Sequence, residues 1–240
     1  MTPASSPFEH RIDGVAFDGT VISPASSSGP HPAVLVMHGW EGRSASQDAI
    51  ARRVADLGYV AVACDLFGDG RRGELDGDNS ALIAPLMEDR SLLRRRVTGT
   101  LEAVQQMPTV DSERTAAMGF CFGGLCVLDL VRSGAPVRTG VSFHGVLTPP
   151  DGLPTMTTSS SVAVFHGWDD PLAPPGDVVA LGGELTEAGA DWQIHAYGHT
   201  MHAFMAMGVH RPEQGLQYNE RSARRAWDSV VRLLDETLRS

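Results

Sequence analysis

The stretch Gly119-Phe120-Cys121-Phe122-Gly123 follows the apolar run Thr115-Ala116-Ala117-Met118 and precedes a helical pattern. A strand that turns at once into a helix needs glycines on both sides of the turn, because a Cβ there would clash. The central residue is then held, exposed, at the head of the helix. Here that residue is Cys121, and a helix N-terminus favours negative charge, so the position suits a thiolate nucleophile.

A candidate acid follows the nucleophile in the sequence. Gly167-Trp168-Asp169-Asp170-Pro171 comes directly after the apolar run 162–165. Asp170 is the preferred acid, because Pro171 fixes the loop and the carboxylate stands three residues after Gly167. Asp169 stays open as an alternative, with an exposed loop charge as its simpler interpretation.

A candidate base comes next, in the stretch 197–204. A neutral His202 imidazole can accept the Cys121 proton and return it to a leaving group, while Asp170 holds its tautomer. His199 competes for this role from three residues away. The pair does not predict a metal site, because no glutamate follows His199, no helix is indicated and no further Cys or His stands at ligand spacing.

The stretch His38-Gly39-Trp40-Glu41-Gly42 follows the first core strand. Its backbone can supply one N–H group to an oxyanion hole, from Trp40 or Gly39, and Phe122 after the nucleophile can supply the other. Glu41 is open to two interpretations, a carboxylate that reaches the Cys121 thiol or a solvated loop charge.

Composition narrows the function classes. The chain has 240 residues, 42% hydrophobic and 20% charged, which is typical of one soluble globular domain spanning 1–240. The net charge of −10 argues against nucleic-acid and anionic-membrane partners. All 19 basic residues are arginines, which excludes Schiff-base, pyridoxal-phosphate and phosphate-loop lysine chemistry.

The cysteines and the apolar runs indicate a compartment. Cys64, Cys121 and Cys126 are an odd number that predicts no disulfide framework, and Cys64 and Cys126 are expected to be structural. No run approaches the roughly 18 apolar residues that span a bilayer, and residues 1–10 do not resemble a signal peptide. We therefore expect a cytoplasmic protein, a monomer or small homo-oligomer.

Strand-like and helical patterns alternate along the chain and predict an α/β fold, with a mostly parallel central sheet covered by helices on both faces. Asp18-Gly19 between two apolar runs predicts a hairpin there, and hence an antiparallel N-terminal edge. Pro85 is expected to split or start the helical stretch 80–107. Pro- and Ser-rich loops are expected at 23–32 and 148–161. The predicted strands are 34–37, 59–63, 115–118, 140–143, 162–165 and 192–196, and the other predicted helices are 46–57, 124–133, 176–188 and 219–238.

From about residue 10 onward the chain resembles the dienelactone hydrolase family, the cysteine branch of the α/β-hydrolases. The resemblance rests on Gly119-x-Cys121-x-Gly123, Gly167-x-x-Asp170-Pro171 and His202-x-Phe204, and on Asp65-Leu66-Phe67. It implies a Cys121–Asp170–His202 triad that hydrolyses a small ester or enol-lactone through a thioester, without metal or cofactor.

Two departures from the family pattern concern the substrate. Family members that act on dienelactone carry a glutamate directly after the position of His38, where this chain has Gly39. They also hold the substrate carboxylate with arginines, but the place four residues after His202 is Ala206. Arg71 or Arg72 is a candidate replacement. Phe204 is a candidate wall of an apolar acyl pocket, as well as an ordinary core residue.

Three other function classes stay open. A general carboxylesterase, thioesterase or deacylase would use the same triad. A catalytically silent ligand-binding domain would need none of Cys121, Asp170 and His202. A thiol redox protein is disfavoured, because Cys121 and Cys126 lack Cys-x-x-Cys spacing.

Overall fold

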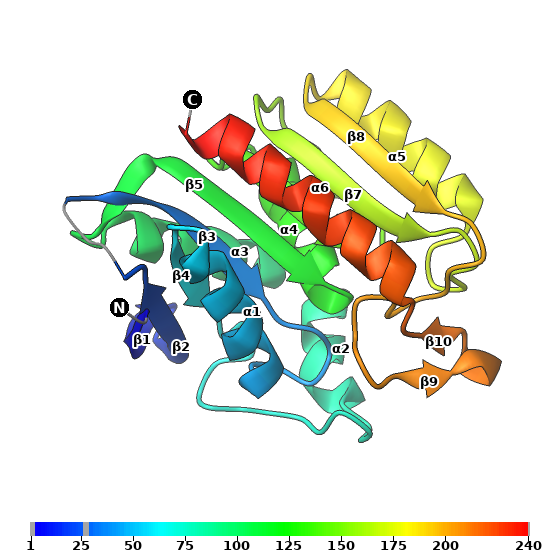
Figure 1. The fold of residues 1–240 in the computed structure, drawn as a ribbon, viewed down its shortest axis with the longest axis horizontal. Helices are drawn as coiled ribbons and strands as arrows, with labels where there is room; N and C mark the ends of the chain where they lie inside the picture. The colour runs from blue at the N-terminus through cyan, green and yellow to red at the C-terminus, as the bar shows by residue number, and fades with distance from the viewer. Residues whose placement is uncertain (1–2, 26–28, 240) are drawn as a thin grey trace.

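The computed structural model describes residues 3–25 and 29–239. An eight-stranded sheet runs through the molecule in the order β1-β2-β4-β3-β5-β6-β7-β8 (Figure 1). The six strands from β3 to β8 pair in parallel with their neighbours among themselves, and β2 pairs antiparallel with both β1 and β4. The mostly parallel sheet and its antiparallel N-terminal edge are therefore confirmed. The sheet strands are β1 (Ala4–Ile12), β2 (Val15–Ser23), β3 (His31–Met37), β4 (Val60–Ala63), β5 (Val110–Phe120), β6 (Thr139–Phe143), β7 (Ser161–Gly167) and β8 (Asp191–Tyr197).

The hairpin prediction at Asp18-Gly19 is wrong. The turn lies at Asp13-Gly14, where both residues have positive φ, and β2 runs straight through Gly19. Glycine serves another purpose at position 19, because a Cβ there would lie 2.7 Å from the carbonyl oxygen of Ala63 on β4. Of the two Asp-Gly pairs in residues 13–19, one is thus a turn and the other makes a close contact between strands.

The helices begin and end close to the predicted bounds. They are α1 (Ala45–Asp56), α2 (Ser80–Glu88), α3 (Arg90–Gln105), α4 (Phe122–Arg132), α5 (Pro175–Glu187) and α6 (Glu220–Arg239). Pro85 lies inside α2, and the stretch divides at Asp89, whose carboxylate accepts the N–H of Leu92 in the first turn of α3. Of the predicted loops, residues 26–28 lie outside the described part of the chain, and 148–160 connects β6 to β7 as expected.

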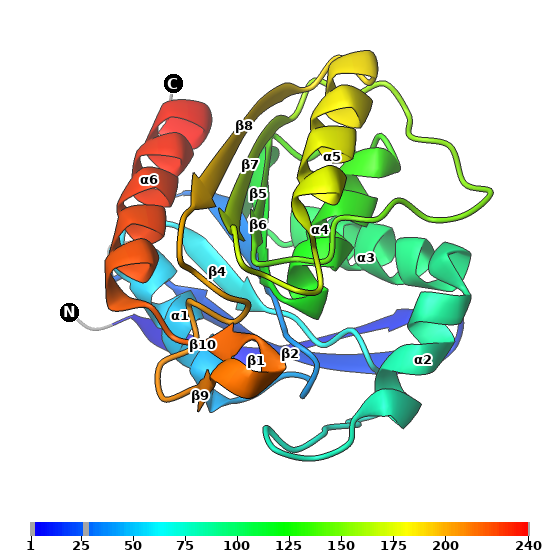
Figure 2. The same cartoon turned by 90° about the vertical axis from the view of Figure 1, so that its right-hand side faces the viewer.

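Two hydrophobic layers enclose the sheet. One layer packs strand side chains against α1 and α6, and the other packs the opposite face against α3, α4 and α5. Figure 2 views the sheet nearly edge-on, with α1 and α6 on one side and α3, α4 and α5 on the other. Strands buried on both faces explain the near-continuous apolar runs of the sequence.

The carboxyl ends of the parallel strands meet at one edge. A small hairpin of β9 (His210–Arg211) and β10 (Leu216–Gln217) lies beyond β7 and β8 at this edge (Figure 1), with the 3-10 turn η1 (Pro212–Gln214) between its strands. Ligands of open parallel sheets bind at such an edge. Within the described ranges, no helix has the length and apolarity to cross a membrane.

Candidate active site

Cys121 occupies the sharp turn between β5 and α4. Its backbone has φ 55° and ψ −117°, a conformation that non-glycine residues rarely adopt. The flanking glycines allow this turn, since a Cβ on Gly119 would lie 2.0 Å from the carbonyl oxygen of Gly123, and one on Gly123 would lie 2.4 Å from that of Met37. The chain thus holds the Cys121 side chain in a strained position at the head of α4.

The three cysteines differ in environment. Cys64 and Cys126 are fully buried, whereas Cys121 is partly exposed. Burial raises the pKa of Cys64 to about 12 and that of Cys126 well above its usual value. Both buried thiols therefore stay protonated at neutral pH and behave as small apolar side chains.

Asp170 and His202 are hydrogen-bonded to each other. Nδ1 of His202 lies 2.7 Å from Oδ2 of Asp170, and both residues are only 2% exposed. The two loops that carry them are in close contact, because a Cβ on Gly167 would lie 2.5 Å from the carbonyl oxygen of Thr200. The N–H of His202 also donates to the carbonyl oxygen of Gly215, beside β10. One hydrogen bond thus orients the imidazole, and the other fixes the backbone that carries it.

The charge state of His202 depends on its neighbours. Burial disfavours the imidazolium, but the negative charge of Cys121 and the hydrogen bond and charge of Asp170 outweigh it and raise the pKa of His202 to about 10. Nε2 lies near the Cys121 sulfur without making a hydrogen bond of standard geometry. The raised pKa favours the imidazolium form of His202 beside the Cys121 sulfur.

The alternative acid and base lie elsewhere. Asp169 is exposed, and its backbone N–H donates to the carbonyl oxygen of Thr200. His199 is exposed and has a φ of 54°. The structure therefore brings Asp170 and His202 together and leaves Asp169 and His199 at the surface.

Two backbone N–H groups lie on the loops beside Cys121. Neither the N–H of Trp40 nor that of Phe122 donates to an acceptor in the part of the chain that the structure describes. The preceding carbonyl group, that of Gly39, accepts from Nδ1 of His38 at 2.7 Å and from the N–H of Gly42 at 3.3 Å. Trp40 and Phe122 thus offer two donors for a developing oxyanion.

Glu41 folds back over its own loop. A Cβ at position 39 would lie 2.8 Å from Oε2 of Glu41. Burial raises the pKa of the Glu41 carboxyl. The Glu41 carboxyl therefore lies against the backbone of Gly39, the position at which the resemblance implies a glutamate.

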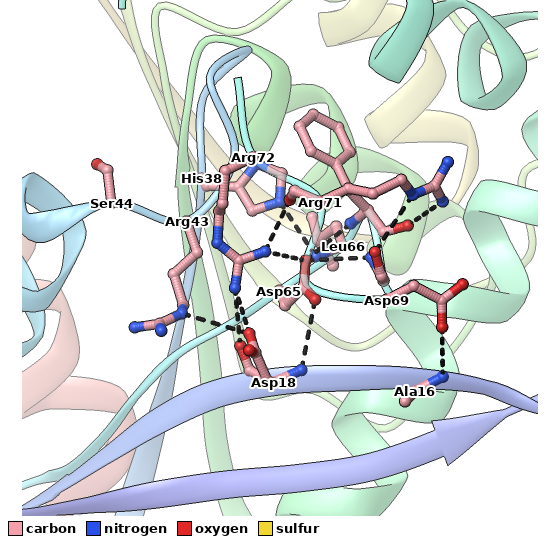
Figure 3. Close-up of polar contacts among 12 residues, drawn as sticks. Ala16, Asp18, His38, Arg43, Ser44, Asp65, Leu66, Asp69, Arg71 and Arg72 are labelled. Atoms are coloured by element: carbon pink, nitrogen blue, oxygen red, sulfur yellow. Dashed lines mark hydrogen bonds and ion pairs between the residues drawn. The ribbon is translucent and has the colours of Figure 1, made fainter. Parts of the chain in front are cut away.

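Arg71 and Arg72 are occupied by other contacts. The Arg71 guanidinium donates to the carbonyl oxygens of Phe67 and Gly68. Arg72 pairs with Asp18 and lies 3.4 Å from Asp65 (Figure 3). Both arginines tie the loop after β4 together, and Arg71, which is exposed, uses two of its five N–H groups for this.

Phe204 is a core residue in this structure. Its side chain is fully buried, with ring centroids 5.4 Å from His144 and 5.6 Å from Tyr197. A wall of a substrate pocket would need an exposed ring face.

Sequence reasoning missed two buried histidines near His202. His144 is 3% exposed and makes an edge contact with the His202 ring at 4.9 Å, and His166 is 1% exposed. Burial lowers the pKa of both, and their nitrogens have no hydrogen-bond partner in the described part of the chain. A repeated signal was present, because an apolar residue, histidine and glycine stand at the carboxyl ends of three strands. They are Met37-His38-Gly39 at β3, Phe143-His144-Gly145 at β6 and Phe165-His166-Gly167 at β7.

The other candidate ligand sites are weak. Over residues 3–25 and 29–239, no group of three or more His, Cys, Asp or Glu side chains is arranged to hold a metal ion. Cavities of about 460 and 590 Å³ lie beside α3, and neither is lined by the candidate residues. The candidate chemistry is concentrated at the carboxyl edge of the sheet.

The chain is similar to known proteins over most of its length. Residues 17–238 match the model of the dienelactone hydrolase family. A putative carboxymethylenebutenolidase of Synechocystis sp. is 26% identical over 224 residues, which cover 88% of each chain. The crystal structure of a dienelactone hydrolase-like promiscuous phosphotriesterase, P91 from metagenomic libraries, is 32% identical with a TM-score of 0.88 over 99% of each chain. An α/β-hydrolase enzyme from a deep-sea metagenome has a TM-score of 0.69 at 18% identity over 100% of this chain and 99% of the other, which shows the fold alone.

Proposed function

This chain belongs to the dienelactone hydrolase family and is a carboxylic ester hydrolase, and from that premise we propose that Cys121, His202 and Asp170 are its catalytic triad. The observation that carries the proposal is the buried 2.7 Å hydrogen bond between His202 and Asp170, beside a cysteine in a strained turn. The substrate is a small ester or lactone, cleaved through a thioester.

The first half of the reaction transfers the acyl group to the enzyme. The Cys121 thiolate attacks the carbonyl carbon, and the carbonyl oxygen becomes an oxyanion that accepts the N–H groups of Trp40 and Phe122. The tetrahedral intermediate collapses, its bond to the leaving oxygen breaks, and His202 gives that oxygen a proton. The products are an alcohol, or the opened end of a lactone, and a thioester on Cys121.

The second half releases the acid. His202, now neutral, takes a proton from a water molecule, and the resulting hydroxide attacks the thioester carbonyl. The same two N–H groups stabilise the second oxyanion. The carbon–sulfur bond breaks, and the Cys121 thiolate returns beside the His202 imidazolium, while Asp170 holds the ring in one tautomer.

The substrate is neutral or weakly polar rather than an anionic dienelactone. A buried carboxylate needs a charged partner, and the position four residues after His202 supplies none, because it is Ala206. Arg72 is paired with Asp18 and lies near Asp65, and two N–H groups of Arg71 bind backbone carbonyl oxygens. Dienelactone should therefore be a poorer substrate than an uncharged ester or lactone of similar size.

A phosphotriester is a second candidate substrate. The 32% identical relative is described as a promiscuous phosphotriesterase. A triester of phosphoric acid carries no charge, so it too would need no free guanidinium in the site. A thioester is a further alternative, since it would use the same triad.

A panel of activated esters, thioesters, lactones and a neutral aryl phosphotriester, assayed with wild type and Cys121→Ala, tests the proposal. We expect turnover of esters and uncharged lactones by wild type and none by Cys121→Ala. Cys126→Ala is the matched control, because it removes a buried thiol from the same helix. Near-normal ester turnover by Cys121→Ala would overturn the assignment.

A further inference from the structure

His38 is a buried imidazole whose two nitrogens are both hydrogen-bonded. It is 0% exposed at the carboxyl end of β3. Nε2 accepts the backbone N–H of Leu66 at 3.0 Å, so the ring proton must stand on Nδ1. Nδ1 then donates to the carbonyl oxygen of Gly39 at 2.7 Å. The histidines at the equivalent ends of β6 and β7, His144 and His166, have no such bonds in the described structure.

The bond from Nδ1 fixes the orientation of one peptide unit. The Gly39 carbonyl and the Trp40 N–H belong to the same planar trans peptide, in which the C=O and N–H vectors point in opposite directions. Holding the Gly39 carbonyl toward His38 therefore aims the Trp40 N–H away from it. A peptide flip would turn the carbonyl oxygen toward the oxyanion and remove the donor.

The other end of the imidazole is bound to a rigid loop. Asp65, which is fully buried, accepts the N–H groups of Phe67 at 3.0 Å and Gly68 at 3.2 Å. The guanidinium of Arg96 binds the carbonyl oxygen of Leu66 at 2.7 Å. Figure 3 shows His38 beside Leu66, with Asp65 and its arginine partner Arg72 next to them. The Leu66 N–H is thus fixed, and through it the ring plane of His38.

We propose that His38 is a positioning residue, which holds the Gly39–Trp40 peptide so that the Trp40 N–H serves the oxyanion. This inference rests on the proposed function of Cys121 and on Trp40 as an oxyanion donor. Burial lowers the pKa of His38 to about 4, so at neutral pH the ring is uncharged and keeps one donor and one acceptor. A charged ring would lose the bond from Leu66.

Packing is the competing explanation. The His38 ring contacts Phe67 at a centroid distance of 4.5 Å and Phe122 at 6.1 Å. If His38 served only to fill this aromatic cluster, a phenylalanine would replace it well and a small side chain poorly. Positioning predicts the opposite order, because an asparagine amide can still donate to the Gly39 carbonyl and a phenyl ring cannot.

The experiment compares kcat and KM for one activated ester in His38→Phe, His38→Asn and His38→Ala. We expect His38→Phe to lose about 10²–10³-fold in kcat with little change in KM, comparable to the removal of one oxyanion donor. His38→Asn should keep a clearly higher kcat than both others. His10→Phe is the matched control, since His10 also stacks on two phenylalanines and bonds Thr100, but lies on β1. It should keep wild-type kcat.

Each outcome decides the matter. Equal kcat in the three variants, or His38→Phe as the most active of them, would overturn the positioning role. If His38→Phe fails to fold, the comparison of His38→Asn with His38→Ala decides, because both leave a space and only asparagine donates. A Cys121→Ala variant in the same assay separates the two proposals. If Cys121→Ala is active, the triad is refuted. If Cys121→Ala is inactive and the three His38 variants have equal kcat, only the positioning role of His38 is refuted.

Discussion

Asp170→Asn tests the pairing of acid and base. The change keeps the side-chain shape but removes the charge that stands 2.7 Å from Nδ1 of His202. A hydrogen bond to a charged group contributes about 1.5–3 kcal/mol, which corresponds to a loss of roughly one to two powers of ten in kcat. The asparagine amide can also donate to Nδ1 and reverse the tautomer. In a serine triad the same change costs about 10⁴-fold. We therefore expect a loss of about 10²- to 10⁴-fold.

The assay is steady-state hydrolysis of an activated ester, accompanied by the pH dependence of kcat/KM. Loss of the Asp170 charge removes one cause of the raised His202 pKa, so the pKa of His202 should fall and the thiolate–imidazolium pair should be less populated at neutral pH. Asp169→Asn is the matched control, because it makes the same chemical change one residue away at an exposed position. A large loss of kcat in Asp169→Asn together with a nearly normal kcat in Asp170→Asn would refute the assignment of Asp170 as the acid.

Four further substitutions test the base, the substrate preference and a buried ion pair. His202→Ala should abolish ester turnover, and His199→Ala should not. Chelators should leave the activity of the wild type unchanged, and a loss of activity that added zinc restores would contradict the metal-free mechanism. Ala206→Arg should raise kcat/KM for a dienelactone relative to an uncharged lactone by about one to two powers of ten, and a wild type that already prefers the dienelactone would contradict the neutral-substrate proposal. Asp129→Ala should lower the free energy of unfolding by about 3–5 kcal/mol in denaturant titrations, because it leaves the buried Arg90 guanidinium without its charged partner. The two hydrogen bonds from Arg90 to Asp129 each measure 2.7 Å. A loss below about 1 kcal/mol would contradict this expectation.

Local sequence patterns predicted most of the sheet. Five of the six parallel strands were visible as apolar runs because their side chains are buried on both faces of the sheet, whereas β8 is largely exposed. β1 was missed because the polar strand Ala4–Ile12 is largely exposed and shows no apolar run. The hairpin was placed at the wrong Asp-Gly pair, since the dipeptide alone does not distinguish a turn from the close approach of Gly19 to Ala63. The pair β9–β10 has two-residue strands, too short for any period to appear.

Part of the candidate site could also be predicted from local sequence patterns. Cys121, Asp170 and His202 each follow a local signal, a glycine-flanked turn or a loop after a strand, so their candidacy needed no tertiary information. The contacts of three other residues, His38, Arg71 and Arg72, depend instead on which loops fold beside them. The bond from the Leu66 N–H to His38 joins residues 28 apart, and no local pattern predicts it.

In the proposed mechanism, Cys121 carries the acyl group during turnover. Intact-protein mass spectrometry with an activated ester whose acyl group is released slowly tests it most directly, in wild type and in Cys121→Ala, with peptide mapping of the label. We expect a mass increase equal to the acyl group on the peptide that contains Cys121, which disappears as product forms, and no increase in Cys121→Ala. Ester turnover without a label on Cys121, or with the label on another residue, would contradict it.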